Sequence, residues 1–347
     1  MGYDGAMPDH ATGSMGPKRA RPPHSQRPLR RLAFRLTAVS IGLFVVLLAS
    51  EAAFRFADIS PMELPPSDAA IAFRVNNEWN SLGLRAPEGF PPPRQAGEWR
   101  IAVLGDSMTY GEGVEPDQAF PTVLQELFRA GAPGIAARAC TVVNMGRLGD
   151  SPTGERARYL QLAERIDADL VLLVVYVNDF ADAVPDPAEM LNRIYVLRDS
   201  LSWPAEYSRV WAYAERKIRV RMAYDETIRY YQAGARDGIR ADAVAPVRAA
   251  VLALRDDVAR RGGRLVVCMV PWLVRLSDYP LGEMHAAVAE MCRAGGVPYC
   301  DLLPAVEGQS DEAMRVSPGN HHPSVACHQR IAAYLARWLT DGGYLSK

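Results

Sequence analysis

The stretch Arg100-Ile-Ala-Val-Leu-Gly-Asp-Ser-Met-Thr-Tyr-Gly111 decides the fold, because an apolar run of strand length ends there in a turn with an acid and a hydroxyl. A strand that is apolar throughout is typical of a parallel sheet covered on both faces. Such a strand presents Ser107 at its carboxyl end, the edge where open parallel sheets bind ligands. The pair His322-Pro323, far along the chain, offers an imidazole that could take the proton of this serine. Because a serine hydroxyl needs a base within hydrogen-bond reach, the two segments together indicate acyl transfer.

Strand and helix patterns alternate from residue 99 onward, which predicts an α/β domain with helices on both faces of a five-stranded parallel sheet. The apolar runs expected as strands are 100–104, 140–144, 170–177, 264–270 and 298–302. The segments expected as helices lie near 119–130, 153–166, 245–261, 281–294 and 324–340. This rhythm predicts a three-layer α/β/α fold.

One segment, at about 180–243, separates the third and fourth strands by more residues than a crossover needs. We expect a helical insertion there, at the carboxyl ends of the strands, where such segments often cover a site. Its many aromatic residues would either pack against the body of the domain, which we favour, or line a substrate groove.

The first 55 residues differ in composition from the rest. Residues 1–31 are rich in Pro, Gly, Ser and Arg without an apolar period, which predicts a disordered basic segment. Residues 32–55 are almost continuously apolar and fit a single transmembrane anchor, which takes about 20 residues. Basic residues before this anchor predict a cytoplasmic amino terminus and a periplasmic or extracellular domain. A signal peptide removed near Ser50-Glu51-Ala52 is the alternative, and it also exports the domain.

Length and charge limit the class of protein. The chain has 347 residues, 49% of them hydrophobic, which is enough for one large domain, expected over 99–347. Its net charge is −1, but residues 1–55 hold eight basic and three acidic side chains, so the remainder carries −6. A mildly acidic domain argues against nucleic acid as a partner. The Pro-rich residues 56–98 are expected to form a linker that packs on this domain.

The five cysteines do not have the spacing of a metal site, and neither a metal nor an organic cofactor is implied. Cys140 and Cys268 lie in strand-like apolar runs, which favours buried thiols that act as small hydrophobic residues. A Cys292–Cys300 disulfide is the alternative in an exported domain.

Small and polar residues follow the expected strands and precede the last helix. They are Gly105-Asp106-Ser107, Asn144-Met-Gly146-Arg-Leu-Gly149, Asn178-Asp179 and His322. In this order they resemble the four conserved blocks of the SGNH hydrolases, the GDSL esterase and lipase family, over residues 99–342. The resemblance implies a flavodoxin-like SGNH fold.

The resemblance also implies roles for individual residues. Ser107 would be the nucleophile and His322 the general base. An oxyanion hole would be formed by the backbone N–H of Ser107, Gly146 and Asn178, since fixed donors stabilise the developing oxyanion. Asp106 is expected to brace the nucleophile turn by hydrogen bonds rather than to act as an acid or base.

The third member of the triad departs from the family pattern. The family usually has Asp two or three residues before the His, whereas this chain has Gly319-Asn320-His321-His322. An amide can orient an imidazole but cannot stabilise the imidazolium as a carboxylate does. The unit would then be Ser107-His322-Asn320, or, as the resemblance also allows, a Ser-His dyad held by a backbone carbonyl. A lowered rate is expected.

Two other residues compete for these roles. Ser151 repeats the tripeptide Gly-Asp-Ser, but Pro152 follows it, and this pattern is typical of the start of a helix. His321 lies beside His322 and is a less favoured base that faces solvent or substrate. Asp179 is expected to be structural.

The flanking segments are similar to a membrane-anchored bacterial subgroup of this family. Its anchor ends in an acid a few residues before an Arg, here Glu51 and Arg55, and an Asn-x-x-Gly-x-Arg stretch follows, here Asn80, Gly83 and Arg85. No catalytic role is assigned to these residues, and Arg85 would pin the linker to the domain.

These observations predict a membrane-tethered serine esterase that acts on acyl esters, including O-acetyl groups on an envelope or extracellular polysaccharide. An O-acetyltransferase would use the same acyl-enzyme with a sugar hydroxyl in place of water. A non-catalytic carbohydrate-binding or assembly module is the alternative from another class, motivated by Gly319 and Asn320. The oligomeric state is not predicted.

Overall fold

The structure is a computed structural model that describes residues 26–57, 79–131, 133–135, 137–183, 201–236, 241–317 and 320–345. The chain forms two compact units. One contains residues 1–60 with 208–210, and the other contains the remaining residues. Most of the segment expected to be disordered, residues 1–25, lies outside the described ranges.

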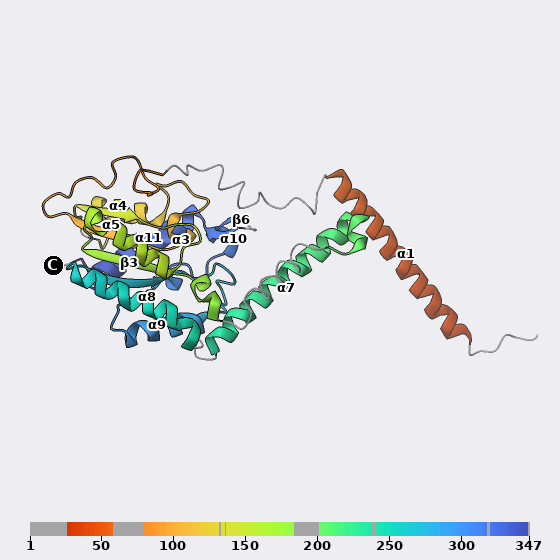
Figure 1. The fold of residues 1–347 in the computed structure, drawn as a ribbon. Helices are drawn as coiled ribbons and strands as arrows, with labels where there is room; N and C mark the ends of the chain where they lie inside the picture. Colours follow the sequence, from red (N-terminus) through yellow and green to blue (C-terminus); the bar gives the residue numbers. More distant parts are fainter. Residues whose placement is uncertain are drawn as a thin grey trace, which may run out of the picture. The chain divides into compact units, whose positions relative to one another are not determined.

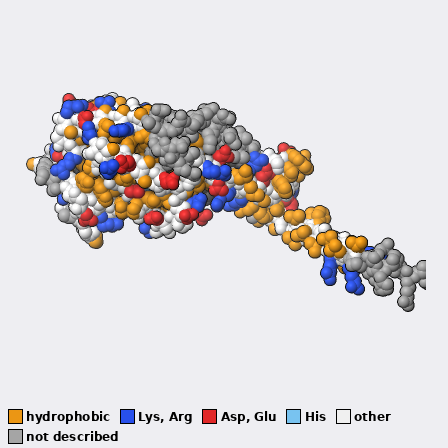
Figure 2. Space-filling model, turned by 90° about the horizontal axis from the view of Figure 1, so that it is seen from below, with side chains coloured by type: hydrophobic (Ala, Val, Ile, Leu, Met, Phe, Trp, Pro, Cys, Tyr) orange, Lys and Arg blue, Asp and Glu red, His pale blue; other side chains and the backbone are white. Residues whose placement is uncertain are grey.

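The first unit contains the helix α1 (Gln26–Phe56). Among the described residues, its Leu29–Phe56 part is the one helix with the length and composition to cross a membrane, and it fits either an anchor or a signal sequence. Figure 2 shows hydrophobic side chains exposed along it. The described part of this helix begins at Gln26, before the expected anchor at 32–55, and the bounds of that anchor stay a prediction.

The second unit is built on a five-stranded parallel sheet with helices on both sides (Figure 1). The strands are β1 (Trp99–Leu104), β2 (Cys140–Asn144), β3 (Leu170–Val175), β4 (Arg264–Met269) and β5 (Tyr299–Asp301). Their order is β2-β1-β3-β4-β5, the flavodoxin-like order, so the predicted fold is confirmed. Ile101 of β1 lies opposite Val142 of β2 and Leu170 of β3, and this register brings the carboxyl ends of the strands to one edge.

Five helices cover the sheet. They are α4 (Phe120–Ala130), α5 (Pro152–Ile166), α8 (Ala241–Arg260), α9 (Gly282–Ala294) and α11 (Val325–Asp341). Helix α4 packs on β2 and α11, while α5 packs on α8, which also covers β4. Strands β1 and β3 are buried along their whole length, as expected for a sheet between two helical layers.

The helical insertion is found between β3 and α8. Its described part contains the 3₁₀ turns η1 (Val177–Ala183) and η2 (Trp203–Glu206) and the helix α7 (Arg209–Arg236), while residues 184–200 and 237–240 lie outside the described ranges. Tyr224 and Tyr231 pack against the hydrophobic core, as expected. Trp203 and Tyr207 do not, since they are 74% and 70% exposed.

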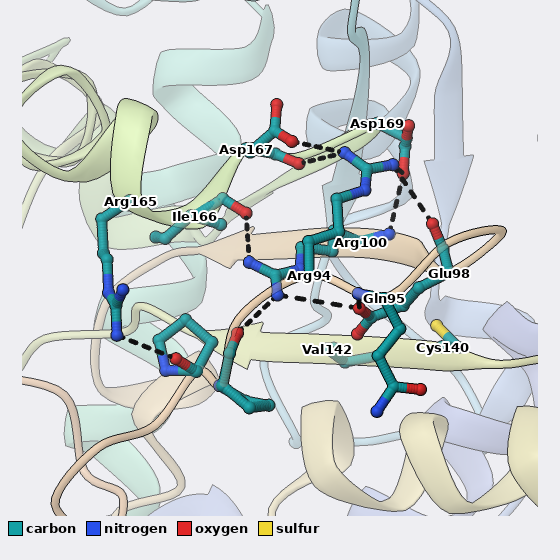
Figure 3. A network of polar contacts seen from close by, with 12 residues as sticks. Arg94, Gln95, Glu98, Arg100, Cys140, Val142, Arg165, Ile166, Asp167 and Asp169 are labelled. Atoms are coloured by element: carbon teal, nitrogen blue, oxygen red, sulfur yellow. Dashed lines mark hydrogen bonds and ion pairs between the residues drawn. The ribbon is translucent and has the colours of Figure 1, made fainter.

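The expected linker is described from residue 79 onward, and arginine side chains connect it to the amino ends of the strands (Figure 3). Arg94 pairs with Asp167 at 2.7 Å and with Asp169 at 2.5 Å, both just before β3. From the start of β1, Arg100 donates to the carbonyl of Ile166 at 3.1 Å. Residues 79–98 are therefore part of the second unit, whereas 58–78 lie outside the described ranges.

A short ribbon that the sequence did not predict follows β5. After η3 (Leu303–Ala305) and α10 (Asp311–Met314), β6 (Arg315–Ser317) pairs antiparallel with β7 (Asn320–Pro323). Runs of three or four residues are too short to give a strand pattern. Strand β7 carries the His-Pro pair, so this ribbon positions the expected base.

All five cysteines are buried free thiols, in agreement with the favoured expectation. Burial raises the pKa of the Cys140 thiol to about 12, so it stays protonated and packs as a hydrophobic residue.

Candidate active site

A sharp turn places Ser107 at the carboxyl end of β1. Ser107 begins the one-turn helix α3 (Ser107–Tyr110), and Asp106 caps this helix by accepting the backbone N–H of Met108 at 2.9 Å. A Cβ atom on Gly105 would lie 2.1 Å from Oγ1 of Thr109, so only glycine fits between the strand and the helix. The shape of the turn therefore requires Gly105, and Asp106 caps the helix that begins with Ser107.

His322 reaches Ser107 from the other end of the chain. Its Nε2 lies 2.8 Å from Oγ of Ser107, and its Nδ1 lies 2.6 Å from Oδ1 of Asn320. The backbone N–H of His322 donates to the same Oδ1 at 2.9 Å, which identifies this atom as an acceptor. Nδ1 therefore carries the ring proton, and Nε2 is left to accept the proton of Ser107.

The environment of His322 disfavours its charged form. Burial lowers the pKa of His322 to about 4. Asn320 is fully buried and its Nδ2 has no hydrogen-bond partner among the described residues, so it orients the ring without a negative charge. The imidazole is neutral at pH 7 and correctly placed, but burial makes it a weak base.

The expected oxyanion donors have different surroundings. The Asn178 side chain donates through Nδ2 to Asp106 at 3.0 Å, and this exposed residue has a second amide N–H that this bond does not use. The N–H of Gly146, by contrast, donates to Oδ1 of Asn144 at 2.9 Å. A Cβ atom on Gly146 would lie 2.3 Å from the backbone nitrogen of Tyr110, so this glycine lets the loop pack on α3. In this structure the N–H of Gly146 is thus engaged by Asn144, and its role as an oxyanion donor stays a prediction.

Buried acids lie below the nucleophile turn. Burial raises the pKa of Asp106, and it raises the pKa of Asp179 and Glu155 further. Asp179 accepts the backbone N–H of Tyr176 at 2.8 Å, a structural contact at the end of β3. Glu155 is buried without a hydrogen-bond partner among the described residues, which favours its neutral form.

The ring of His321 is engaged by the aromatic residues around it. Nδ1 accepts the indole N–H of Trp272 at 2.9 Å, and Nε2 lies 2.5 Å from the hydroxyl of Tyr224. Since an indole can only donate, the ring proton of His321 lies on Nε2 and is directed at Tyr224. His321 thus connects the strand of the base to α7 of the insertion, and it does not contact Ser107 in this arrangement.

The second Gly-Asp-Ser tripeptide has a different setting. Ser151 precedes α5 as its N-cap residue, and Pro152 is the first residue of that helix. Ser151 is exposed, and its backbone N–H donates to Asp150 at 3.0 Å. Of the two serines, Ser107 is the one hydrogen-bonded to His322.

Arg85 fixes the loop that follows the nucleophile. Its guanidinium donates to the carbonyls of Tyr110 at 3.3 Å, Gly111 at 2.8 Å and Val114 at 2.6 Å, and it lies 4.6 Å from the centre of the Tyr110 ring. Arg85 is only 5% exposed. A residue from the linker segment thus forms part of the support of the site.

Sequence reasoning missed Glu112, which lies in this loop. Its Oε2 is 3.3 Å from Nε2 of His322. The only sequence signal is an acid between two glycines just after the nucleophile, and this pattern does not reveal where the side chain points.

A search of curated protein sequences finds no match to the chain. Solved structures of low identity are similar to it. TesA is 15% identical, with 71% of this chain and 99% of that chain covered and a TM-score of 0.42. A lipase/acylhydrolase from Enterococcus faecalis is 16% identical, with 70% and 96% covered and a TM-score of 0.42. A catalytic mutant of Axe2, an acetylxylan esterase from Geobacillus stearothermophilus, is 15% identical, with 70% and 94% covered and a TM-score of 0.40.

The model of the GDSL-like lipase/acylhydrolase family matches residues 103–330, which is more than half of the chain. The matched region runs from β1 to α11 and contains the nucleophile turn and the His-Pro pair. The chain therefore belongs to the GDSL-like lipase/acylhydrolase family, the SGNH hydrolases, as a hydrolase of the esterase and acylhydrolase type.

Proposed function

We propose that the chain is a serine esterase that forms an acyl-enzyme on Ser107. The observation that carries this proposal is the 2.8 Å hydrogen bond between Oγ of Ser107 and Nε2 of His322. Oγ attacks the ester carbonyl carbon while its proton moves to Nε2, and the π electrons collect on the carbonyl oxygen. When the intermediate collapses, that proton passes to the alcohol oxygen as the C–O bond breaks. Water, deprotonated by His322, then attacks the acyl carbon. As the Oγ–C bond breaks, the proton on Nε2 returns to Oγ of Ser107 and the acid is released.

The tetrahedral oxyanion needs fixed donors. The second amide N–H of Asn178 is held for this purpose by the bond to Asp106, and the backbone N–H of Ser107 lies at the start of α3. Donors of this kind lower the barrier by about 3 kcal/mol each in well-studied hydrolases.

The domain is proposed to work outside the cytoplasm, tethered by α1. Arg30, Arg31 and Arg35 lie toward the amino end of this helix, and this bias favours a cytoplasmic amino terminus. An exported esterase without a cofactor fits short acyl esters, including O-acetyl groups on extracellular or envelope polysaccharide.

A fluorophosphonate probe tests the proposed chemistry on the full chain in detergent, because it reacts with an activated serine. We expect labelling that is lost in Ser107→Ala and kept in Ser151→Ala. No labelling of the wild-type chain would favour a non-catalytic module, and labelling kept in Ser107→Ala would remove Ser107 as the nucleophile. With an acetylated substrate, free acetate indicates an esterase, whereas label on an added glycan indicates an O-acetyltransferase.

A further inference from the structure

The base of the proposed esterase faces an acid on the side of the nucleophile. Oε2 of Glu112 lies 3.3 Å from Nε2 of His322, the nitrogen that also bonds Ser107 at 2.8 Å. The side chains of Glu112 and His322 are each 18% exposed, so their interaction is only partly screened by water. On the other side of the ring, Nδ1 meets the neutral amide of Asn320.

Two glycines fix the backbone of Glu112. Gly111 and Gly113 have φ angles of 83° and 87°, which favour glycine. A Cβ atom on Gly113 would lie 2.8 Å from Cγ2 of Val316 on β6, so the loop approaches the catalytic ribbon closely. The backbone N–H of Glu112 donates to the carbonyl of Ser107 at 3.2 Å. The position of this acid therefore follows from the nucleophile turn on one side and from β6 on the other.

The reaction requires a positive charge on His322. A nearby carboxylate favours an imidazolium, whereas burial, which lowers the pKa of His322, disfavours it. We propose that Glu112 stabilises the imidazolium of His322 from the Nε2 side, in place of the acid that is missing beside Nδ1. This inference rests on the proposed esterase function and adds a catalytic residue to it.

The position of Glu112 fits the path of the proton. When the proton of Ser107 moves to Nε2 and the Oγ–C bond forms, the new N–H lies between the leaving alcohol oxygen and Oε2 of Glu112. The proton then passes to the alcohol oxygen as the C–O bond breaks, and Glu112 remains a carboxylate throughout. Glu112 neither gains nor loses a proton in the cycle.

Within the described ranges, the other titratable groups considered around His322 do not supply this negative charge. His328 of α11 is fully buried, and burial lowers its pKa to about 3, so it is neutral at pH 7. His321 and Tyr224 are hydrogen-bonded to each other on the β7 and α7 side. A tyrosine is ordinarily uncharged at this pH.

The first test measures the His322 ring by NMR titration of the full chain labelled with ¹⁵N-histidine, with the signal assigned by its loss in His322→Asn. We expect Glu112→Gln to lower the pKa of His322, so that the protonation constant of the ring falls at least tenfold. Glu115→Gln removes the same charge from the same loop, where it acts on Arg85, and should leave the titration unchanged. An unchanged His322 titration in Glu112→Gln overturns the inference, whether or not the chain hydrolyses esters.

The second test is kinetic. With p-nitrophenyl acetate, Glu112→Gln should lower kcat at least tenfold with little change in KM, because the imidazolium forms only in the transition state. In the double variant Glu112→Gln with Asn320→Asp, kcat should be at least threefold higher than in Glu112→Gln alone. The reason is that Asn320→Asp places a negative charge beside Nδ1 of His322. A structural role of Glu112 predicts no such rescue, and its absence overturns the inference. Failure of the esterase function itself would appear differently, as a wild-type chain without Ser107-dependent hydrolysis.

Discussion

Oδ1 of Asn320 lies 2.6 Å from Nδ1 of His322, where the family usually places a carboxylate. The amide accepts both the ring N–H and the backbone N–H of His322, so it holds the ring at the angle that Ser107 requires. Asn320 therefore orients the ring of His322 but does not supply the negative charge that a carboxylate would. That charge has to come from another residue.

Replacing the Asn320 amide by an acid tests whether this residue orients the His322 ring. Asn320→Asp should leave kcat unchanged or raise it, because Oδ1 keeps its two hydrogen bonds and gains charge. The second oxygen would replace a buried Nδ2 that has no partner among the described residues, so the unfolding temperature should fall. Steady-state kinetics and thermal unfolding check the two effects. A loss of kcat of more than tenfold, about 1.4 kcal/mol of barrier, would contradict the assignment of Asn320.

Removal of the Asn178 amide should affect turnover rather than binding. Asn178→Ala deletes the proposed oxyanion donor, which is needed mainly in the transition state, so kcat should fall by about 100-fold or more. KM should change little, and the circular dichroism spectrum should remain that of the wild type. A loss below tenfold would mean that Asn178 serves only to hold Asp106.

Alanine substitutions at Gly146 and Gly149, the two glycines of the second block, should lower the free energy of unfolding by different amounts. In Gly146→Ala the new Cβ would lie 2.3 Å from the Tyr110 nitrogen, so α3 must shift, with an expected loss of about 3 kcal/mol or more in the free energy of unfolding. Gly149→Ala is the control. Its φ of 66° gives strain of about 1 kcal/mol, but nothing lies within 4 Å of the added Cβ. Urea unfolding of both variants measures the difference, and equal losses would contradict the packing role of Gly146.

Acid should destabilise the domain through His328. Burial lowers the pKa of this side chain to about 3, below its ordinary value of 6.5, so the unfolded chain binds a proton that the folded one excludes. The stability from this group is complete above pH 6.5 and is lost as pH falls toward 3, by up to about 1.4 kcal/mol per pH unit. Urea unfolding between pH 7 and pH 4 measures this slope. In His328→Asn, whose amide can still accept the Phe120 N–H, the slope should decrease.

Much of the fold could be predicted because its signals are local. Strand β2 was expected at 140–144 and is found there, and Ser107 lies at the end of a strand whose apolar run ends at Gly105. The meeting of Ser107 with His322 was also expected, because their segments resemble the first and last conserved blocks of the family.

Other features depend on three-dimensional contacts that leave no local pattern. The approach of Glu112 to His322 depends on Gly113 packing against Val316 of a ribbon that is too short to be recognised. The close packing of Gly146 on α3 could not be predicted either, because a glycine required for close packing has no signal of its own in a sequence. This packing depends on the position of the Tyr110 backbone.

The Arg85 contacts have a practical consequence for any trimmed version of the enzyme. The family match begins at residue 103, but the loop with Glu112 is held by a guanidinium that enters from upstream of that boundary. A fragment cut at the family boundary would leave three carbonyls without their donor, and its low activity could be mistaken for a property of the chemistry. A soluble form intended for assay should therefore start no later than Trp79, where the described segment leading to Arg85 begins.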